Sequence, residues 1–278
     1  QLENNSSDSA YFDNYKKAKA LCEEAIAKFP KSKGAKNCEN LIKRIEEPQI
    51  DITLNSVQLP NEAIPAVLEY KNTTAPYYRI VKVSEKELKK LGGLRKEELL
   101  EALNKKSAVA EQELTLSPET DYRHHSTLIA LPALEEGIYY LTATTKQDIK
   151  SEDKTLIISF QVSNLGYITD SKYEQMTVVV VDRKTGKTVE GVTVEFCRRE
   201  WDYKAREYKT IVLNTVKSDK NGKAVMTGKE REITTFYINL RNGDDVLLSD
   251  INFSIGSPNR NDGVYHTTML FTDRAIYR

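Results

Sequence analysis

The sequence predicts a mainly β protein, in which tandem antiparallel β-sandwiches follow a small α-helical hairpin. Short segments rich in β-branched and aromatic residues recur between residues 49 and 271, separated by turn residues. The 15 Tyr, against one Trp and three Met, suit a β-rich chain. Apolar residues spaced by three and four, which indicate helices, occur mainly before residue 48 and in one insertion.

Length and charge exclude several classes of protein. A chain of 278 residues fits about two domains. Lys plus Arg and Asp plus Glu both number 41, so the net charge is zero and no basic excess favours nucleic acid as a partner. No apolar run reaches the ~18–20 residues of a membrane span, so we expect no direct membrane insertion. The polar start, Gln1 to Asp8, lacks an initiator Met and suggests a trimmed or processed chain.

Residues 9–48 are predicted to form the helical hairpin. Pro30 ends the first helix, Ser32 is the expected N-cap of the second, and so short a turn makes the helices antiparallel. One such pair cannot bury both its faces, so we expect it to pack on the next domain or on a partner. The sequence pattern of the hairpin resembles a tetratricopeptide-like helical pair at Ala18, Ala25, Phe29, Pro30 and Ser32. The apolar faces comprise Tyr11, Tyr15, Ala18, Leu21, Cys22, Ala25, Ile26 and Phe29, then Ala35, Cys38, Leu41, Ile42 and Ile45.

Two of the three cysteines lie in this hairpin. Cys22 and Cys38 are equally far in sequence from Pro30, so in an antiparallel hairpin they fall at the same height, both on apolar faces. A disulfide is expected if the compartment is oxidising, and two buried free thiols are the alternative. Cys197, on a predicted strand with apolar neighbours, is interpreted as a buried thiol.

The first β-domain is predicted over residues 49–163. It contains a helical insertion at 84–105, where Ser84 and Glu87 have the spacing of a capping box and Gly92-Gly93 breaks the helix. Several short strands with one helical excursion indicate an antiparallel sandwich. The expected strands are 50–54, 66–70, 77–83, 108–116, 126–131, 137–144 and 155–162.

The second β-domain is predicted over residues 164–271. The continuous apolar run 176–181 indicates a strand buried on both faces. Alternation from Val189 to Phe196 predicts a strand around Gly191, and Asn221-Gly222 predicts a hairpin turn with positive φ. The last expected strands are 234–240, 246–249 and 264–271.

An aromatic, charged stretch runs from Arg198 to Lys209. Trp201, Tyr203 and Tyr208 within it are candidates for an exposed contact loop. The interpretation we favour is a β-hairpin whose aromatic rings pack on the sandwich.

The sequence contains no motif that predicts catalysis, a cofactor or a metal site. His124 and His125 are adjacent and so point to opposite faces of a strand, which is poor geometry for one metal ion. No HExxH, P-loop, GxSxG or GxGxxG motif is present, and the acidic pairs are adjacent instead of separated. We therefore expect a non-enzymatic chain without a bound cofactor and interpret the histidines as surface residues.

The closing segment, VYHTTMLFTDRAIYR, resembles the FTDRxxYRPG signature of the α2-macroglobulin family. The matching residues are Phe271, Thr272, Asp273, Arg274, Tyr277 and Arg278. Two further sequence segments, 182–194 and 218–224, resemble segments of macroglobulin and carboxypeptidase-regulatory sandwiches. The resemblance implies macroglobulin-type, immunoglobulin-like β-sandwiches, an N-terminal fragment of a bacterial α2-macroglobulin-like protein, and residues 272–278 leading into a missing domain.

In that family, cleavage of a bait segment closes a ring of macroglobulin domains around a protease. The resemblance thus implies a scaffold portion of a protease trap in the cell envelope, periplasmic or outer-membrane-associated and lipid-anchored upstream. Its partners would be target proteases, through the full-length parent, and further macroglobulin domains of the same chain. The Cys-Gly-Glu-Gln of a thioester is absent. The alternatives are a tandem-sandwich adhesin and a carboxypeptidase-regulatory accessory domain.

Overall fold

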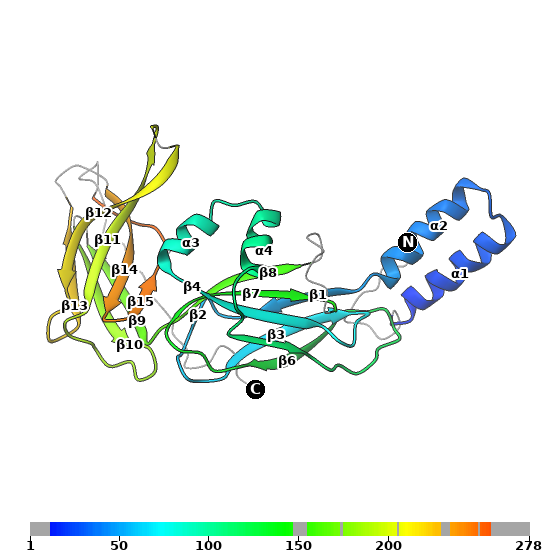
Figure 1. Cartoon of the computed structure of the whole chain (residues 1–278), viewed down its shortest axis with the longest axis horizontal. Helices are drawn as coiled ribbons and strands as arrows, with labels where there is room; N and C mark the ends of the chain where they lie inside the picture. Colours follow the sequence, from blue (N-terminus) through cyan, green and yellow to red (C-terminus); the bar gives the residue numbers. More distant parts are fainter. Residues whose placement is uncertain are drawn as a thin grey trace. The chain divides into compact units, whose positions relative to one another are not determined.

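A computed structural model describes residues 12–146, 155–172, 175–204, 206–228, 234–249 and 251–256. The chain divides into two compact units, Gln1–Asn164 and Leu165–Arg278. Antiparallel sheets make up most of both, and a helical hairpin precedes the first, so the predicted fold class is confirmed (Figure 1). Within the described ranges, no helix has both the length and the apolarity needed to cross a membrane.

The helical hairpin consists of α1 (Asn14–Lys28) and α2 (Lys33–Glu46), which run side by side (Figure 1). Ser32 caps α2 as expected, because its Oγ accepts a hydrogen bond of 3.0 Å from the backbone N–H of Ala35. At the other end of α2, Glu47 is extended and Pro48 follows. A proline there cannot continue the helix, so the chain turns into the first strand.

The first unit contains a three-stranded and a five-stranded sheet. All their pairings are antiparallel except that of β2 with β8, which is parallel and was not expected from the sequence. The three-stranded sheet has the order β1 (Gln49–Thr53), β3 (Ile64–Lys71), β6 (His125–Leu131). The five-stranded sheet has the order β2 (Val57–Gln58), β8 (Leu156–Val162), β7 (Gly137–Thr144), β4 (Tyr77–Val83), β5 (Ala110–Glu113).

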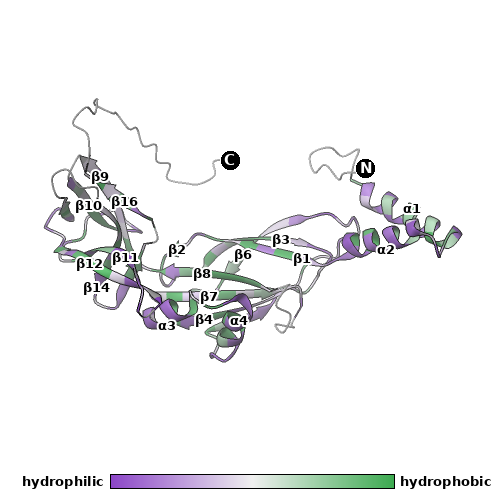
Figure 2. Ribbon diagram, turned by 90° about the horizontal axis from the view of Figure 1, so that it is seen from above, coloured by the Kyte–Doolittle hydropathy of each residue, from purple (hydrophilic) through white to green (hydrophobic). Residues whose placement is uncertain are grey.

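One hydrophobic core lies between these two sheets. Leu68 of β3 and Leu141 of β7 are both 0% exposed and belong to the same cluster. The rings of Tyr139 and Phe160 stack in it with centroids 5.5 Å apart. Figure 2 shows apolar residues gathered on these strands. Burial of apolar side chains from both sheets makes this unit a sandwich.

The helical insertion forms α3 (Glu85–Leu91) and α4 (Lys96–Asn104), between β4 and β5. The predicted capping box is confirmed, since Ser84 Oγ accepts from Glu87 N–H at 3.3 Å and Ser84 N–H donates to Glu87 Oε2 at 2.8 Å. Leu100 and Leu103 of α4 are buried. Arg79 of β4 donates to the Leu103 carbonyl at 3.1 Å, which ties α4 to the sheet.

The second unit also contains two antiparallel sheets. Phe196 and Phe236 meet edge to face in its core, with ring centroids 5.3 Å apart. The first sheet has the order β13 (Lys223–Thr227), β10 (Gln175–Asp182), β9 (Leu165–Lys172). The second has the order β12 (Glu207–Lys217), β11 (Thr193–Asp202), β14 (Thr234–Asn242), β15 (Asp245–Leu248), and β16 (Phe253–Ile255) also pairs with β14.

Two details of the second unit differ from the prediction and one agrees. Along β10, Met176, Val178 and Val180 are buried whereas the alternate residues are half-buried or exposed, so only one face is in the core. β11 begins at Thr193 and not at residue 189, because Gly191 takes a left-handed φ of 80° that interrupts an extended chain. Gly222 has the predicted positive φ, 73°, in the turn before β13.

Candidate functional site

The predicted site residues belong to separate parts of the sequence. The signature residues Phe271, Thr272, Asp273, Arg274, Tyr277 and Arg278 lie outside the described residues. Cys22 and Cys38 are in the helical hairpin, and the three aromatic candidates are on β11 and β12 or between them. The structure adds a polar junction between the hairpin and the first sandwich, to which the sequence analysis assigned no role.

The junction begins where β3 ends, beneath the C-terminus of α2. The last carbonyls of a helix lack partners within it. Asn72 Nδ2 donates to the carbonyls of Ile45 at 2.7 Å and Glu47 at 3.3 Å, and Lys71 Nζ donates to that of Arg44 at 3.2 Å. The Asn72 amide group and the Lys71 ammonium group also complement the partial negative charge of the helix dipole at the C-terminus of α2. Two consecutive residues of the sandwich thus cap the helix.

The charge of Lys71 is mostly hidden from water. The residue is 5% exposed, and its Nζ lies 5.4 Å from the centre of the Tyr15 ring of α1. Burial lowers the pKa of Lys71, an effect that the charge of Glu47 partly opposes. In place of water, the ammonium group contacts the Tyr15 ring of α1 and the Arg44 carbonyl of α2. One side chain therefore contacts both helices of the hairpin.

The backbone at Asn72 is adapted to this role. Its φ is 54°, in the left-handed region, which Asn tolerates better than most residues. Asn72 is the first residue after β3, and the turn at this residue brings its side chain to the end of α2. The residues Lys71-Asn72-Thr73-Thr74 are typical of a turn. Nothing in this local sequence predicts hydrogen bonds to carbonyls 25 and 27 residues earlier.

A second group of contacts ties α1 to the loop before β6. Lys19 Nζ forms an ion pair of 2.6 Å with Glu46 and donates to Tyr122 Oη at 3.0 Å. These two hydrogen bonds, led by that to Glu46, raise the pKa of Lys19. The guanidinium of Arg123 lies 3.7 Å from the centre of the Phe12 ring, a cation–π contact.

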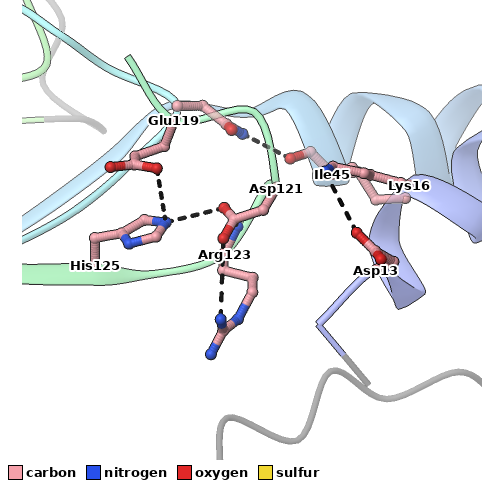
Figure 3. A network of polar contacts seen from close by, with 8 residues as sticks. Asp13, Lys16, Ile45, Glu119, Asp121, Arg123 and His125 are labelled. Carbon is pink, nitrogen blue, oxygen red and sulfur yellow. Dashed lines mark hydrogen bonds and ion pairs between the residues drawn. The ribbon is translucent and has the colours of Figure 1, made fainter. Parts of the chain in front are cut away.

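The same loop holds a cluster of acidic residues around His125, shown in Figure 3. His125 Nε2 lies 2.9 Å from Asp121 Oδ1 and 4.0 Å from Glu119 Oε2. Burial would raise the pKa of Asp121, but hydrogen bonds from His125 and from the Arg123 backbone outweigh it and the pKa is lowered. His125 also packs on Tyr70, with centroids 5.7 Å apart. His125 is therefore a half-buried member of a network and not a free surface residue.

The charged groups of this cluster are engaged with one another and with the loop. No group of three or more His, Cys, Asp or Glu side chains suited to a metal ion occurs within the described ranges. The charges pair with one another and with the loop backbone, since Arg123 N–H donates to Asp121 Oδ1 at 3.0 Å. What the arrangement can do is hold the loop in one conformation against the hairpin.

The cysteine pair lies between the helices, as the hairpin geometry predicted. Cys22 is 7% exposed and Cys38 is half-buried, and both are thiols in this structure. Burial, followed by a hydrogen bond with the Cys38 thiol, raises the pKa of Cys22 to about 11. Cys197, by contrast, is buried in the second unit beside Asn239, whose Nδ2 lies 3.6 Å from its sulfur.

The aromatic candidates lie on a two-stranded ribbon formed by the far halves of β11 and β12, residues 198–211. β11 pairs with β14 only as far as Cys197, after which its described partner is β12 alone. The hairpin prediction is confirmed, but the packing of its rings on the sandwich is wrong. Trp201 and Tyr208 contact each other across the ribbon at 5.0 Å and are 41% and 69% exposed, and Tyr203 is 85% exposed.

The described surface also has two open hollows. One, of about 370 Å³, is lined by Lys43, Arg44, Glu46, Glu47 and Pro48. The other, of about 160 Å³, is lined by Glu87, Lys90, Leu91, Ala102 and Lys106. Both mix charges of opposite sign at shallow sites, unlike the enclosed, mostly apolar pockets that bind small molecules.

Comparisons with known proteins place the fold. A structure of native α2-macroglobulin from Escherichia coli, spanning domains MG0-NIE-MG1, matches with a TM-score of 0.52 and 14% identity, over 74% of this chain and 64% of that one. A shorter structure of that protein, spanning NIE-MG1, matches with a TM-score of 0.49 and 14% identity, over 73% of this chain and 97% of that one. Protein-family models and curated proteins give no match to the sequence. The chain therefore has a macroglobulin-like fold and spans less than two thirds of the first of these structures.

Proposed function

We propose that this chain is a scaffold portion of a bacterial α2-macroglobulin-like endopeptidase inhibitor, a protease trap of the cell envelope. The observation that carries the proposal is the fold shared with the MG0-NIE-MG1 region of the E. coli protein across 74% of the chain. The FTDRxxYR resemblance at residues 271–278 supports it independently, because it comes from sequence alone.

The contribution of this chain to a trap would be mechanical. The first unit has a continuous core between two sheets. The side chains of Lys71 and Asn72 hold its helical hairpin by donating hydrogen bonds to backbone carbonyls at the end of α2. Such contacts fix direction as well as position. In this proposal the chain catalyses nothing, and its partners are further macroglobulin domains and, through the full-length protein, the target protease.

The test is protease shielding by the full-length product of the natural gene. A protease enclosed in a cage keeps its active site free, so we expect a small chromogenic substrate to be cleaved at the normal rate and a protein substrate to be protected. Loss of both activities would indicate an active-site inhibitor, and loss of neither would exclude a trap. Fractionation of the native cells with an antibody to this chain tests the envelope location, and a cytoplasmic signal would contradict it.

The exposed ribbon favours a second candidate, a tandem-sandwich adhesin or binding module. Clustered, exposed aromatic rings are a common feature of binding surfaces, and Trp201, Tyr203 and Tyr208 are all exposed. If this candidate is correct, the isolated chain binds a glycan or protein ligand and the Trp201→Ala variant loses that binding. The trap proposal predicts no such ligand for the isolated chain.

A further inference from the structure

The helical hairpin has little apolar packing of its own. Its helices have 15 and 14 residues, lengths at which an isolated helix is marginal in water. The larger apolar side chains Leu21 and Phe29 are 59% and 64% exposed, and Leu41 is 38% exposed. Fully buried apolar positions are few in the pair, so the contact between α1 and α2 lacks the core that usually holds two helices together.

Cysteines occupy the centre of that contact. Cys22 lies in the middle of α1 and Cys38 near the middle of α2. The thiol of Cys22 is buried and interacts with that of Cys38, which is more accessible. Small scaffolds with too little core commonly rely on disulfides for stability, and a bridge here would join the helices at mid-height and not at their turn.

We propose that Cys22 and Cys38 form an intramolecular disulfide that staples the helical hairpin when the chain meets a disulfide oxidant. The proposal concerns the hairpin alone and stands whichever function the whole protein has. Cys197 takes no part, because it is 0% exposed in the second unit.

The chemistry is a thiol–disulfide exchange with an oxidant such as glutathione disulfide. The thiolate of the more accessible Cys38 attacks the oxidant, forms a mixed disulfide and releases one glutathione. Cys22 then gives its proton to solvent and attacks the Cys38 sulfur, which releases the second glutathione. Two protons and two electrons leave the protein thiols, one S–S bond forms in the protein, and the oxidant disulfide is reduced to two thiols.

The experiment uses the whole chain, purified reduced and then incubated with glutathione disulfide at mildly alkaline pH. After alkylation of the remaining thiols, we expect a monomer that has lost two hydrogens, a peptide linking residues 22 and 38, and Cys197 alkylated after denaturation. A stable glutathione adduct on Cys38, or a disulfide between two chains, would overturn the proposal. The Cys38→Ala variant is the control and should form no internal bridge.

Two further measurements test whether the bridge is a staple. Because it closes a loop of roughly 15 residues, amide exchange in α1 and α2 should slow by about 100-fold on oxidation. Exchange in β14 of the second unit should stay unchanged. Because both steps need a thiolate, bridge formation should be faster at mildly alkaline than at mildly acidic pH. Equal exchange of the hairpin in both forms would refute the staple.

Discussion

Substitution of Asn72 tests whether a few directed hydrogen bonds hold the helical hairpin to the first sandwich. The Asn72 side chain donates to two carbonyls at the end of α2, at 2.7 and 3.3 Å. A hydrogen bond contributes about 0.5–1.5 kcal/mol net, and the longer bond contributes less. Asn72→Gly removes both donors and keeps the left-handed φ accessible, so we expect a loss of about 1–2 kcal/mol in hairpin attachment. Asn72→Ala adds backbone strain at φ 54° and should cost roughly 1 kcal/mol more.

The assay is amide exchange along α2, read against global unfolding by urea. The control is Asn61→Gly, which makes the same change at a similar φ, 58°, on an exposed residue whose side chain has no hydrogen bond within the described part of the chain. Faster exchange of the last turn of α2 in Asn72→Gly, with Asn61→Gly near wild type, is the expected result. If both glycine variants behave alike, the directed-bond argument is wrong.

Three further predictions concern the core, the insertion and the ribbon. Leu141→Ala should destabilise the first unit by about 2–5 kcal/mol in urea unfolding, because this side chain is 0% exposed, whereas Leu128→Ala, at 75% exposed, should change stability by less than about 0.5 kcal/mol. Ion pairing with Lys106 and the Ser84 cap lower the pKa of Glu87 to about 2, so its contribution to α3 is present above the ordinary value near 4.5 and lost as pH falls through about 2. Amide exchange of α3 should follow this window and be flat across it in Glu87→Gln. Trp201→Ala should leave the free energy of unfolding in urea within about 0.5 kcal/mol of wild type, and a larger loss would mean that the ribbon contributes to the stability of the fold.

Local signals in the sequence were enough to predict most elements and their ends. β4 and β7 fall at the predicted residues, and the caps at Ser32 and Ser84 are those that the spacing indicated. These features depend on residues within a few positions of one another. A side chain hydroxyl and a backbone N–H three residues later can be paired from sequence alone.

The features that were missed depend on distant partners. Asn72 reaches back 27 residues to Ile45, which no local pattern encodes. The exposure of Trp201 follows from the pairing of β14, which leaves β11 beyond Cys197 while Thr234–Phe236 of β14 pair with β16. The apolar run in β10 was assigned two buried faces because composition cannot show that only one face of its sheet meets the core.

The most direct test of the scaffold proposal is a side-by-side protease assay of this chain and the full-length product. Each is mixed in molar excess with an endopeptidase, and cleavage of a protein substrate and of a small substrate is followed. The proposal predicts that the full-length product protects the protein substrate alone, while the isolated chain changes neither rate. Stoichiometric inhibition by the isolated chain, or a full-length product that protects nothing, would contradict it.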